Sequence, residues 1–200
     1  MQENKREQKK ALIVAAAYDL IETRGYAGTS MLAIAKAAKA SNETLYNWYG
    51  DKVGLFSALV AQNAKDVEAV LLAAQTQRAN PAMALSEVGA ALLDMLLGAR
   101  AIALNRAAAA DETGTLGGAL ALEGRARIAP LVQDLIDSAV AAKALSGDAP
   151  EIVETFFALL IADQQVRRVT GAMAAPTPAE NAARARRAVT QLERLFPPKK

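Results

Sequence analysis

Cysteine and histidine are both absent from this 200-residue sequence. Their absence excludes disulfides, thiolate nucleophiles, most zinc sites and the commonest general base. The carboxylates form no paired motif, and no segment shows the alternating pattern of a strand. We therefore expect neither an enzyme nor a metal site, and the sequence indicates no cofactor.

An excess of charge of either sign is also missing, because 23 basic and 21 acidic residues leave a net charge of only +2. Bulk attraction to nucleic acid or to a membrane is therefore weak, and any such interaction depends on local placement of charge. The first residues are polar and mixed in charge, unlike a signal peptide, and the longest early apolar run, residues 11–18, is too short to span a bilayer. These features predict a soluble, cytoplasmic protein.

Alanine, by contrast, is abundant: the sequence holds 47 alanines within an apolar fraction of 52%. Because alanine is the best helix former, this composition predicts an all-α fold. A chain of this length corresponds to about one or two domains.

Apolar spacing and capping residues predict a helix over about residues 5–24, two short helices after Ser30 and Ser41, and a longer helix from residue 51 to the break at 80–81. Helical spacing then resumes, and residues 111–118 are expected to form a mobile loop or a broken helix. A later stripe ends near Gly147. Two capping boxes, at 148–151 and 177–180, predict helices that continue through Val166 and to Phe196.

The two short helices are separated by only about three residues, 39–41, which is the outline of a helix-turn-helix whose second helix enters a DNA major groove. All tyrosines and the only tryptophan precede residue 50, and Tyr46 and Trp48 lie in that second helix. Their hydroxyl and indole donors suit phosphate contacts at its flanks. Lys52, just beyond it, is placed to add a charged phosphate contact.

The second short helix has two distinct faces. On a helical wheel Leu45 and Tyr49 share one face, and Glu43, Thr44 and Asn47 lie roughly opposite. The first face is suited to burial. The second offers an amide for adenine, a carboxylate for cytosine N4 and a hydroxyl, so this face is predicted to read bases.

These residues resemble the tetracycline-repressor (TetR/AcrR) family of transcriptional regulators. The resemblance covers about Ile13 to Leu59 and is carried by Arg24-Gly25-Tyr26, Thr29-Ser30, Ile34-Ala35, Thr44-Leu45-Tyr46, Trp48-Tyr49, Lys52 and Leu55. It implies a homodimer with a helix-turn-helix domain at residues 1–50. It also implies that residues 51–200 bind a small-molecule effector and dimerise.

The resemblance carries over a set of DNA-binding residues. Thr29 and Ser30 would contact phosphate, the groove would be faced by Ser41, Asn42, Glu43, Thr44 and Asn47, and the DNA backbone would be held by Tyr46, Trp48 and Lys52. Lys39 departs from the family, because a turn glycine is usual there, and a positive φ at lysine would strain the backbone. Glu43 departs too, because it places an acid at a position that is often small or basic.

Two further features leave alternatives open. The basic residues Lys5, Arg6, Lys9 and Lys10 form either an arm on DNA phosphate or an ordinary solvated charge run. The acidic Glu43 and the low net charge also leave room for a second function, a helical small-molecule or protein-binding module that does not recognise an operator.

Apolar residues repeat at intervals of three and four from Ala182 to Phe196, a narrow seam that suits helix pairing. Together with the resemblance, this favours a dimer interface, whereas packing inside its own subunit is the alternative. The residues predicted for that interface are Phe156, Ala185, Val189, Leu192 and Phe196. Four arginines, Arg184, Arg186, Arg187 and Arg194, are expected to form its solvated rim.

The candidate effector ligands are polar residues near apolar helices, namely Arg100, Asn105, Asp163 and Gln164. After residue 50 the only aromatic residues are phenylalanines, which favours a small or aliphatic effector. By the resemblance, effector binding would move the two recognition helices and lower affinity for a palindromic operator.

Overall fold

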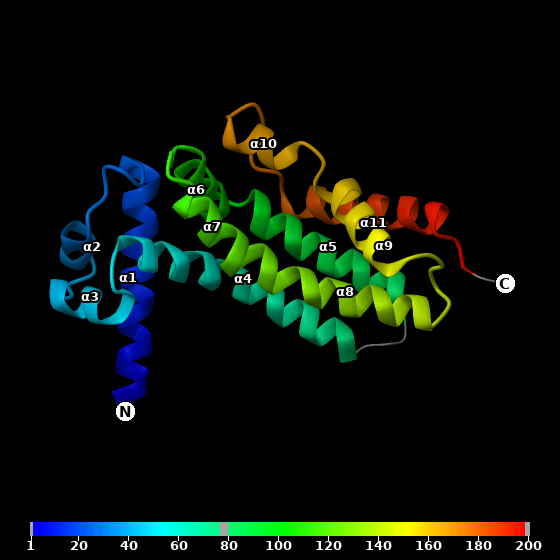
Figure 1. Ribbon diagram of the computed structural model, residues 1–200, viewed down its shortest axis with the longest axis horizontal. Coiled ribbons are helices and arrows are strands. Elements are labelled where there is room, and N and C mark those ends of the chain that lie inside the picture. The colour runs from blue at the N-terminus through cyan, green and yellow to red at the C-terminus, as the bar shows by residue number, and fades with distance from the viewer. Residues whose placement is uncertain (1, 77–79, 199–200) are drawn as a thin grey trace. The chain divides into compact units, whose positions relative to one another are not determined.

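The computed structural model describes residues 2–76 and 80–198, and every regular element in these ranges is helical (Figure 1). The expectation of an all-α fold is confirmed. The elements are α1 (Gln2–Arg24), α2 (Met31–Ala37), α3 (Asn42–Tyr49), α4 (Lys52–Thr76), α5 (Pro81–Leu97), α6 (Ala99–Ala109), α7 (Thr115–Leu120), the π-helical turn η1 (Ala121–Arg125), α8 (Ala126–Ala141), α9 (Ala149–Ile161), α10 (Gln164–Val169) and α11 (Pro178–Leu195).

The chain divides into two compact units. The first holds the residues up to Gln62 together with Ala103–Glu123, and the second holds Asn63–Ile102 and the residues from Gly124 onward. Neither unit is one continuous stretch of sequence.

The first unit is built around α1, α2, α3 and the start of α4. Leu45 of α3 and Leu59 of α4 are fully buried in its core, and the Tyr18 hydroxyl donates a hydrogen bond of 2.8 Å to the Leu59 carbonyl. Leu104 and Leu116, from the later segment, enter the same core. The helix-turn-helix is therefore supported from behind by apolar residues of four helices besides its own two.

The second unit is built around α5, which packs along α11 and also contacts α8, α9 and α10. Gly89 of α5 permits the close approach, because a Cβ there would lie 3.1 Å from the Ala185 Cβ and 3.2 Å from the Leu160 Cδ1. Among the described residues no single helix is long and apolar enough to cross a bilayer. Only α5 and α6 taken together, a pair bent at the break between them, reach the length and apolar composition of a spanning segment.

Residues 111–118, expected to form a mobile loop or a broken helix, hold only a short break, because α7 already begins at Thr115. The Asp111 carboxylate accepts hydrogen bonds from the Leu116 amide at 2.8 Å and from the Thr113 hydroxyl at 2.8 Å. These bonds lower the pKa of Asp111 and satisfy amides at the start of α7. The chain breaks here between two helices, one of the two forms expected.

The continuous helix predicted through Val166 is wrong, because α9 ends at Ile161. Ala162 adopts φ +46° and ψ −127°, which ends the helix, and α10 begins two residues later. The Arg184 guanidinium donates hydrogen bonds to the Leu159 and Leu160 carbonyls, so a cation from α11 caps the open end of α9. The stripe expected to end near Gly147 also ends earlier, at the last residue of α8.

We expect Ala162→Gly to raise the free energy of unfolding of the protein by about 1 kcal/mol, because glycine adopts the observed positive φ without strain. Urea denaturation would measure the change. The matched control is Ala69→Gly on the exposed side of α4, where glycine should lower the free energy of unfolding by about 1 kcal/mol. Equal destabilisation by both substitutions would contradict the strain at Ala162.

Candidate nucleic-acid interface

The first helix of the motif begins at an N-cap. The exposed Ser30 accepts a hydrogen bond of 3.1 Å from the Ala33 amide, as its sequence position predicts. Thr29 behaves differently: it is 2% exposed, and its hydroxyl donates to the Gly25 carbonyl at 2.8 Å. A phosphate contact by Thr29, predicted from the sequence, would compete with this bond, because the buried hydroxyl already holds the end of α1.

The turn between α2 and α3 is a Schellman motif with an unusual residue at its centre. The Ala40 amide donates to the Ala35 carbonyl and the Lys39 amide donates to the Lys36 carbonyl, which is the bonding pattern of that motif. The residue between these bonds, Lys39, has φ +50°. Glycine is the usual residue in this conformation, so the strain anticipated at Lys39 is present.

The recognition helix α3 is fixed at its first residue and on one face. Its N-cap Ser41 accepts a hydrogen bond of 3.0 Å from the Thr44 amide, and the two hydroxyls lie 2.7 Å apart. Leu45 is completely buried, whereas Glu43 and Asn47 are exposed on the other side. The two faces predicted from the helical wheel are confirmed for Leu45, Glu43 and Asn47, whereas Thr44 and Tyr49 are half-buried.

Aromatic side chains flank the exposed face of α3. Tyr46 is 48% exposed, and Trp48 and Tyr49 are half-buried. Burial, with a smaller contribution from the Glu7 carboxylate, raises the pKa of the Tyr49 phenol. Tyr46 is thus the aromatic residue of α3 that is most open to a partner.

Lys52 lies directly after the α3–α4 corner, as the sequence indicates, but its ammonium already has a partner. Its Nζ lies 4.1 Å from the centre of the Tyr26 ring, a cation–π contact. Burial lowers the pKa of Lys52. Burial also raises the pKa of the Tyr26 phenol, and the negative charges of Asp51 and Asp111 raise it further. A phosphate contact by Lys52 would compete with this ring contact.

The basic residues expected as either a DNA arm or a solvated run belong to the first turns of α1, and two of them contact their own chain. The Lys9 ammonium donates a hydrogen bond of 2.6 Å to the Lys39 carbonyl. The Arg6 guanidinium carbon lies 5.6 Å from the centre of the Trp48 ring. Sequence reasoning missed both contacts, although the three-residue spacing of Arg6 and Lys9 in line with Ile13 is a signal that they share the inner face of α1.

The candidate effector residues fall into separate parts of the fold. Arg100 is exposed near the start of α6, and Asn105 lies further along that helix in the first unit. Asp163 and Gln164 adjoin the α9–α10 break, where burial and the nearby Arg187 lower the pKa of Arg184 and the Asp163 carboxylate partly opposes that shift. The Gln164 Oε1 is buried without a hydrogen-bond partner among the described residues.

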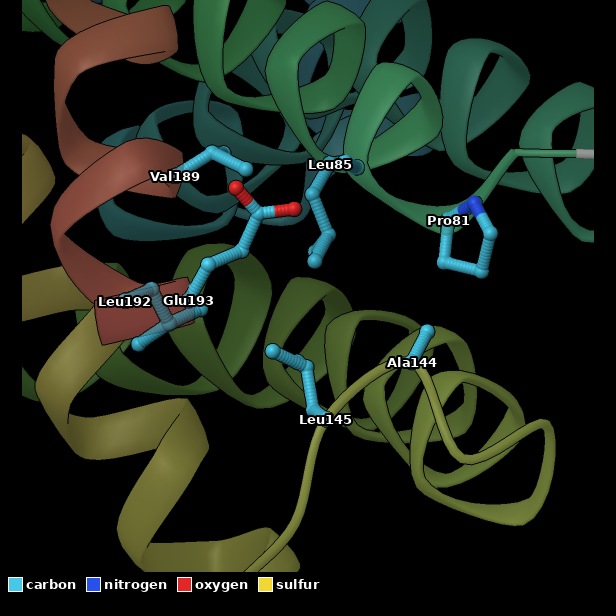
Figure 2. A pocket seen from close by; sticks show the side chains of 8 residues that line it. Pro81, Leu85, Ala144, Leu145, Val189, Leu192 and Glu193 are labelled. Atoms are coloured by element: carbon cyan, nitrogen blue, oxygen red, sulfur yellow. The ribbon is translucent and has the colours of Figure 1, made fainter. Parts of the chain in front are cut away.

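A small apolar crevice of the second unit lies elsewhere, between the first turns of α5, the segment after α8 and the last turns of α11. Figure 2 shows Leu85, Leu145 and Val189 around it, with the Glu193 carboxylate directed toward Leu85 and Val189. It has room for about one water molecule. None of the four candidate effector residues lines it.

The apolar seam of α11 packs inside its own subunit. Ala185 and Leu192 have no exposed surface and Val189 is 3% exposed, because the seam faces α5 and α9. Phe156 is fully buried as well, and Phe196 is half-buried. The interface predicted on Phe156, Ala185, Val189 and Leu192 is therefore corrected, since a side chain already covered by its own chain does not offer a surface to a second copy, whereas for half-buried Phe196 it stays a prediction.

The arginines around this seam need one correction too. Arg186, Arg187 and Arg194 are exposed, as expected of a solvated rim. Arg184 instead points into the subunit and caps α9, and burial lowers its pKa.

Two family models match the chain. Residues 13–59 match the bacterial regulatory proteins of the tetR family, and residues 83–196, more than half of the chain, match the C-terminal domain of AefR-like transcriptional repressors. No curated protein matches the sequence significantly.

Solved structures with the same fold cover nearly the whole chain. One described as a TetR-family transcriptional regulator from Mesorhizobium loti is 23% identical with a TM-score of 0.78, over 95% of this chain and 97% of that one. A TetR transcriptional regulator from Agrobacterium tumefaciens is 27% identical with a TM-score of 0.77, over 96% of each chain. FadR from Bacillus subtilis, solved in complex with stearoyl-CoA, is 13% identical with a TM-score of 0.72, over 92% of this chain and 97% of that one. The helix-turn-helix, the all-helical C-terminal part and both family matches agree: this chain belongs to the TetR family of bacterial transcriptional regulators, with a C-terminal domain of the AefR-like repressor type.

Proposed function

We propose that this protein is a homodimeric, ligand-responsive repressor that binds a palindromic operator through the α3 helix of each copy. Residues 1–50 are assigned to DNA recognition, and residues 51–200 to effector binding and dimerisation. The observation that carries the proposal is the anchoring of α3 by buried Leu45, which leaves Asn42, Glu43 and Asn47 exposed on a short helix. A helix presented in this way fits a DNA major groove.

The side chains around α3 divide by chemistry. Asn42 and Asn47 suit adenine, and Glu43 suits the N4 donor of cytosine, so these residues are assigned to bases. Ser41 and Thr44 are assigned to the groove beside them, and the groups assigned to positioning on phosphate are Thr29, Ser30, Tyr46, Trp48 and Lys52.

The dimer is assigned to the outer sides of α9 and α11, as in the family. Partly exposed Val153, Phe157 and Ile161 lie beside exposed Ala158 on α9 and would supply its apolar contact. Glu151 and Glu154 are exposed on α9, and Arg186 and Arg187 are exposed on α11. These opposite charges suit a two-fold interface, in which the acidic side of α9 in one copy faces the basic side of α11 in the other.

The effector is assigned to the second unit, with Asp163 and Gln164 as its first candidate contacts. The buried, unpaired Gln164 carbonyl oxygen is costly unless a donor reaches it, and a ligand is one source of such a donor. The aromatic residues of this unit are phenylalanines, which supports a small or aliphatic ligand. Release from DNA would require a coupling of about 1 to 3 kcal/mol between the two sites.

The experiment that tests the function is selection of bound sequences from a random duplex pool at near-physiological salt. We expect enrichment of a two-fold symmetric site whose half-site centres lie about 10 base pairs or slightly more apart. Absence of any enrichment would favour the second function, a TetR-like binding module without operator recognition.

Asn47→Ala is expected to weaken binding to the selected duplex by about 1 to 3 kcal/mol and to leave binding to random duplex unchanged, because an exposed base contact is lost. Fluorescence anisotropy with both duplexes measures the difference, and Asn63→Ala on α4 is the control. Unchanged discrimination between the two duplexes would remove Asn47 from the base-reading residues.

Ala158→Arg is expected to convert the dimer to a monomer, because an arginine on the exposed side of α9 would be buried against the second copy. Sedimentation at micromolar concentration measures the oligomeric state. The same exchange at exposed Ala69 of α4 should leave the dimer intact. A dimeric Ala158→Arg protein would place the interface on another surface.

A further inference from the structure

The turn that leads into α3 is held from outside by a cation. At the positive φ of Lys39 the chain leaves α2, and the Lys39 carbonyl lies just past the last turn of that helix, where carbonyl oxygens lack intrahelical partners. The Lys9 ammonium bonds this oxygen. A cation is favourable at the negative end of a helix dipole, and a charged hydrogen bond is stronger than a neutral one. The strained turn is therefore offset by a contact from α1.

The far end of α3 is held from the same helix. Trp48, the residue before the last one of α3, lies under the Arg6 guanidinium in a cation–π contact. The Glu7 carboxylate is close enough to the Tyr49 phenol to help raise its pKa. The first turns of α1 thus contact both the turn before α3 and the last residues of α3.

Arg6 and Lys9 differ from the neighbouring basic residues in their contacts, which reach the α2–α3 turn and α3. Arg6, Lys9 and the fully buried Ile13 follow one another at intervals of three and four, so they lie on one face of α1. Figure 1 shows the first half of α1 beside α3. Lys10, four residues after Arg6, lies on the same side of α1, but its ammonium pairs with Glu7 at 2.8 Å, and Lys5 is exposed.

We propose that Lys9 and Arg6 are positioning residues for DNA recognition, which hold the α2–α3 turn and Trp48 so that α3 enters the groove in one orientation, and that neither side chain binds phosphate. This inference rests on the proposed DNA binding by α3. A phosphate ligand supports all sequences alike and contributes to the salt dependence of affinity. A positioning residue instead supports the specific complex, in which the base contacts require a fixed helix.

The test compares Lys9→Met with Lys5→Met, since both remove one charge from the start of α1. Affinities for the symmetric duplex selected by the wild type and for a random duplex are measured by anisotropy over a range of salt. We expect Lys9→Met to lose roughly five- to tenfold in affinity for the selected duplex, with little change on the random duplex and an unchanged salt slope. Lys9→Arg, which keeps a charged donor, should restore the wild-type ratio of the two affinities. Lys5→Met should leave that ratio unchanged.

A second pair of variants tests the mechanism through the strain at Lys39. Lys39→Gly removes the strain that Lys9 offsets, so adding it to Lys9→Met should recover most of the lost discrimination. In the free protein, Lys9→Met should speed hydrogen exchange of the Ala40 amide, which is bonded to the Ala35 carbonyl in this turn. Arg6→Met should lower discrimination similarly without changing the salt slope.

Three results would overturn the inference. An equal loss on both duplexes, with a salt slope reduced by about one unit, would make Lys9 a phosphate ligand. A lower melting temperature with unchanged discrimination would make its role structural only. Unchanged Ala40 exchange would show that Lys9 does not hold the turn, and this readout needs no DNA. A wild type that fails to discriminate between the duplexes would instead refute the proposed function, whatever the exchange rates show.

Discussion

Leu45 is the only fully buried side chain of α3, a helix that the structure describes in full and that has eight residues. A helix of that length is marginal in water by itself, so its shape and direction depend on what it is packed against. Leu45 supplies the apolar contact, Ser41 fixes the first turn and the flanking aromatic residues are half-buried. Because so few groups tie α3 down, the rest of its surface remains open to a partner. Because α3 has so few anchoring contacts, its orientation is sensitive to the helices packed around it.

Cations at helix ends recur through both units. Lys9 bonds the carbonyl that follows α2, Arg184 bonds two carbonyls at the end of α9, and Arg168 donates a hydrogen bond of 3.0 Å to the Leu97 carbonyl at the end of α5. Each places positive charge where carbonyl oxygens lack intrahelical donors. The net charge of the sequence does not indicate this role of the basic residues, because part of the positive charge faces the protein's own backbone rather than solvent.

Local signals in the sequence were sufficient for the helix-turn-helix. Ser30 and Ser41 cap the helices they were predicted to cap, and the wheel of α3 places Leu45 inward, because capping and amphipathic spacing act within a few residues. The reciprocal capping box of Thr177 and Glu180 at the start of α11 is confirmed for the same reason.

Features that depend on distant partners could not be read in this way. The end of α9 before Ala162 is capped by Arg184, a residue of another helix. The apolar spacing around Ala162 gives no sign of this break. The seam of α11 has the spacing of any helix that packs against another, and only the tertiary structure shows that α5 and α9 of the same chain cover it. The burial of Thr29 likewise follows from its hydroxyl bond to the end of α1 rather than from its residue type.

The first unit draws its core from two stretches of chain that are separated by Asn63–Ile102. Leu104, Ala107 and Leu116 come from the later stretch and are buried among residues of the earlier one. A ribosome adds about 5 to 20 residues per second, so a nascent chain that has passed Gln62 still lacks this part of its core for several seconds. The recognition unit is therefore completed only after α5 has been synthesised. During translation, the recognition unit therefore packs fully only after residues Asn63–Ile102, which belong to the second unit, have been made.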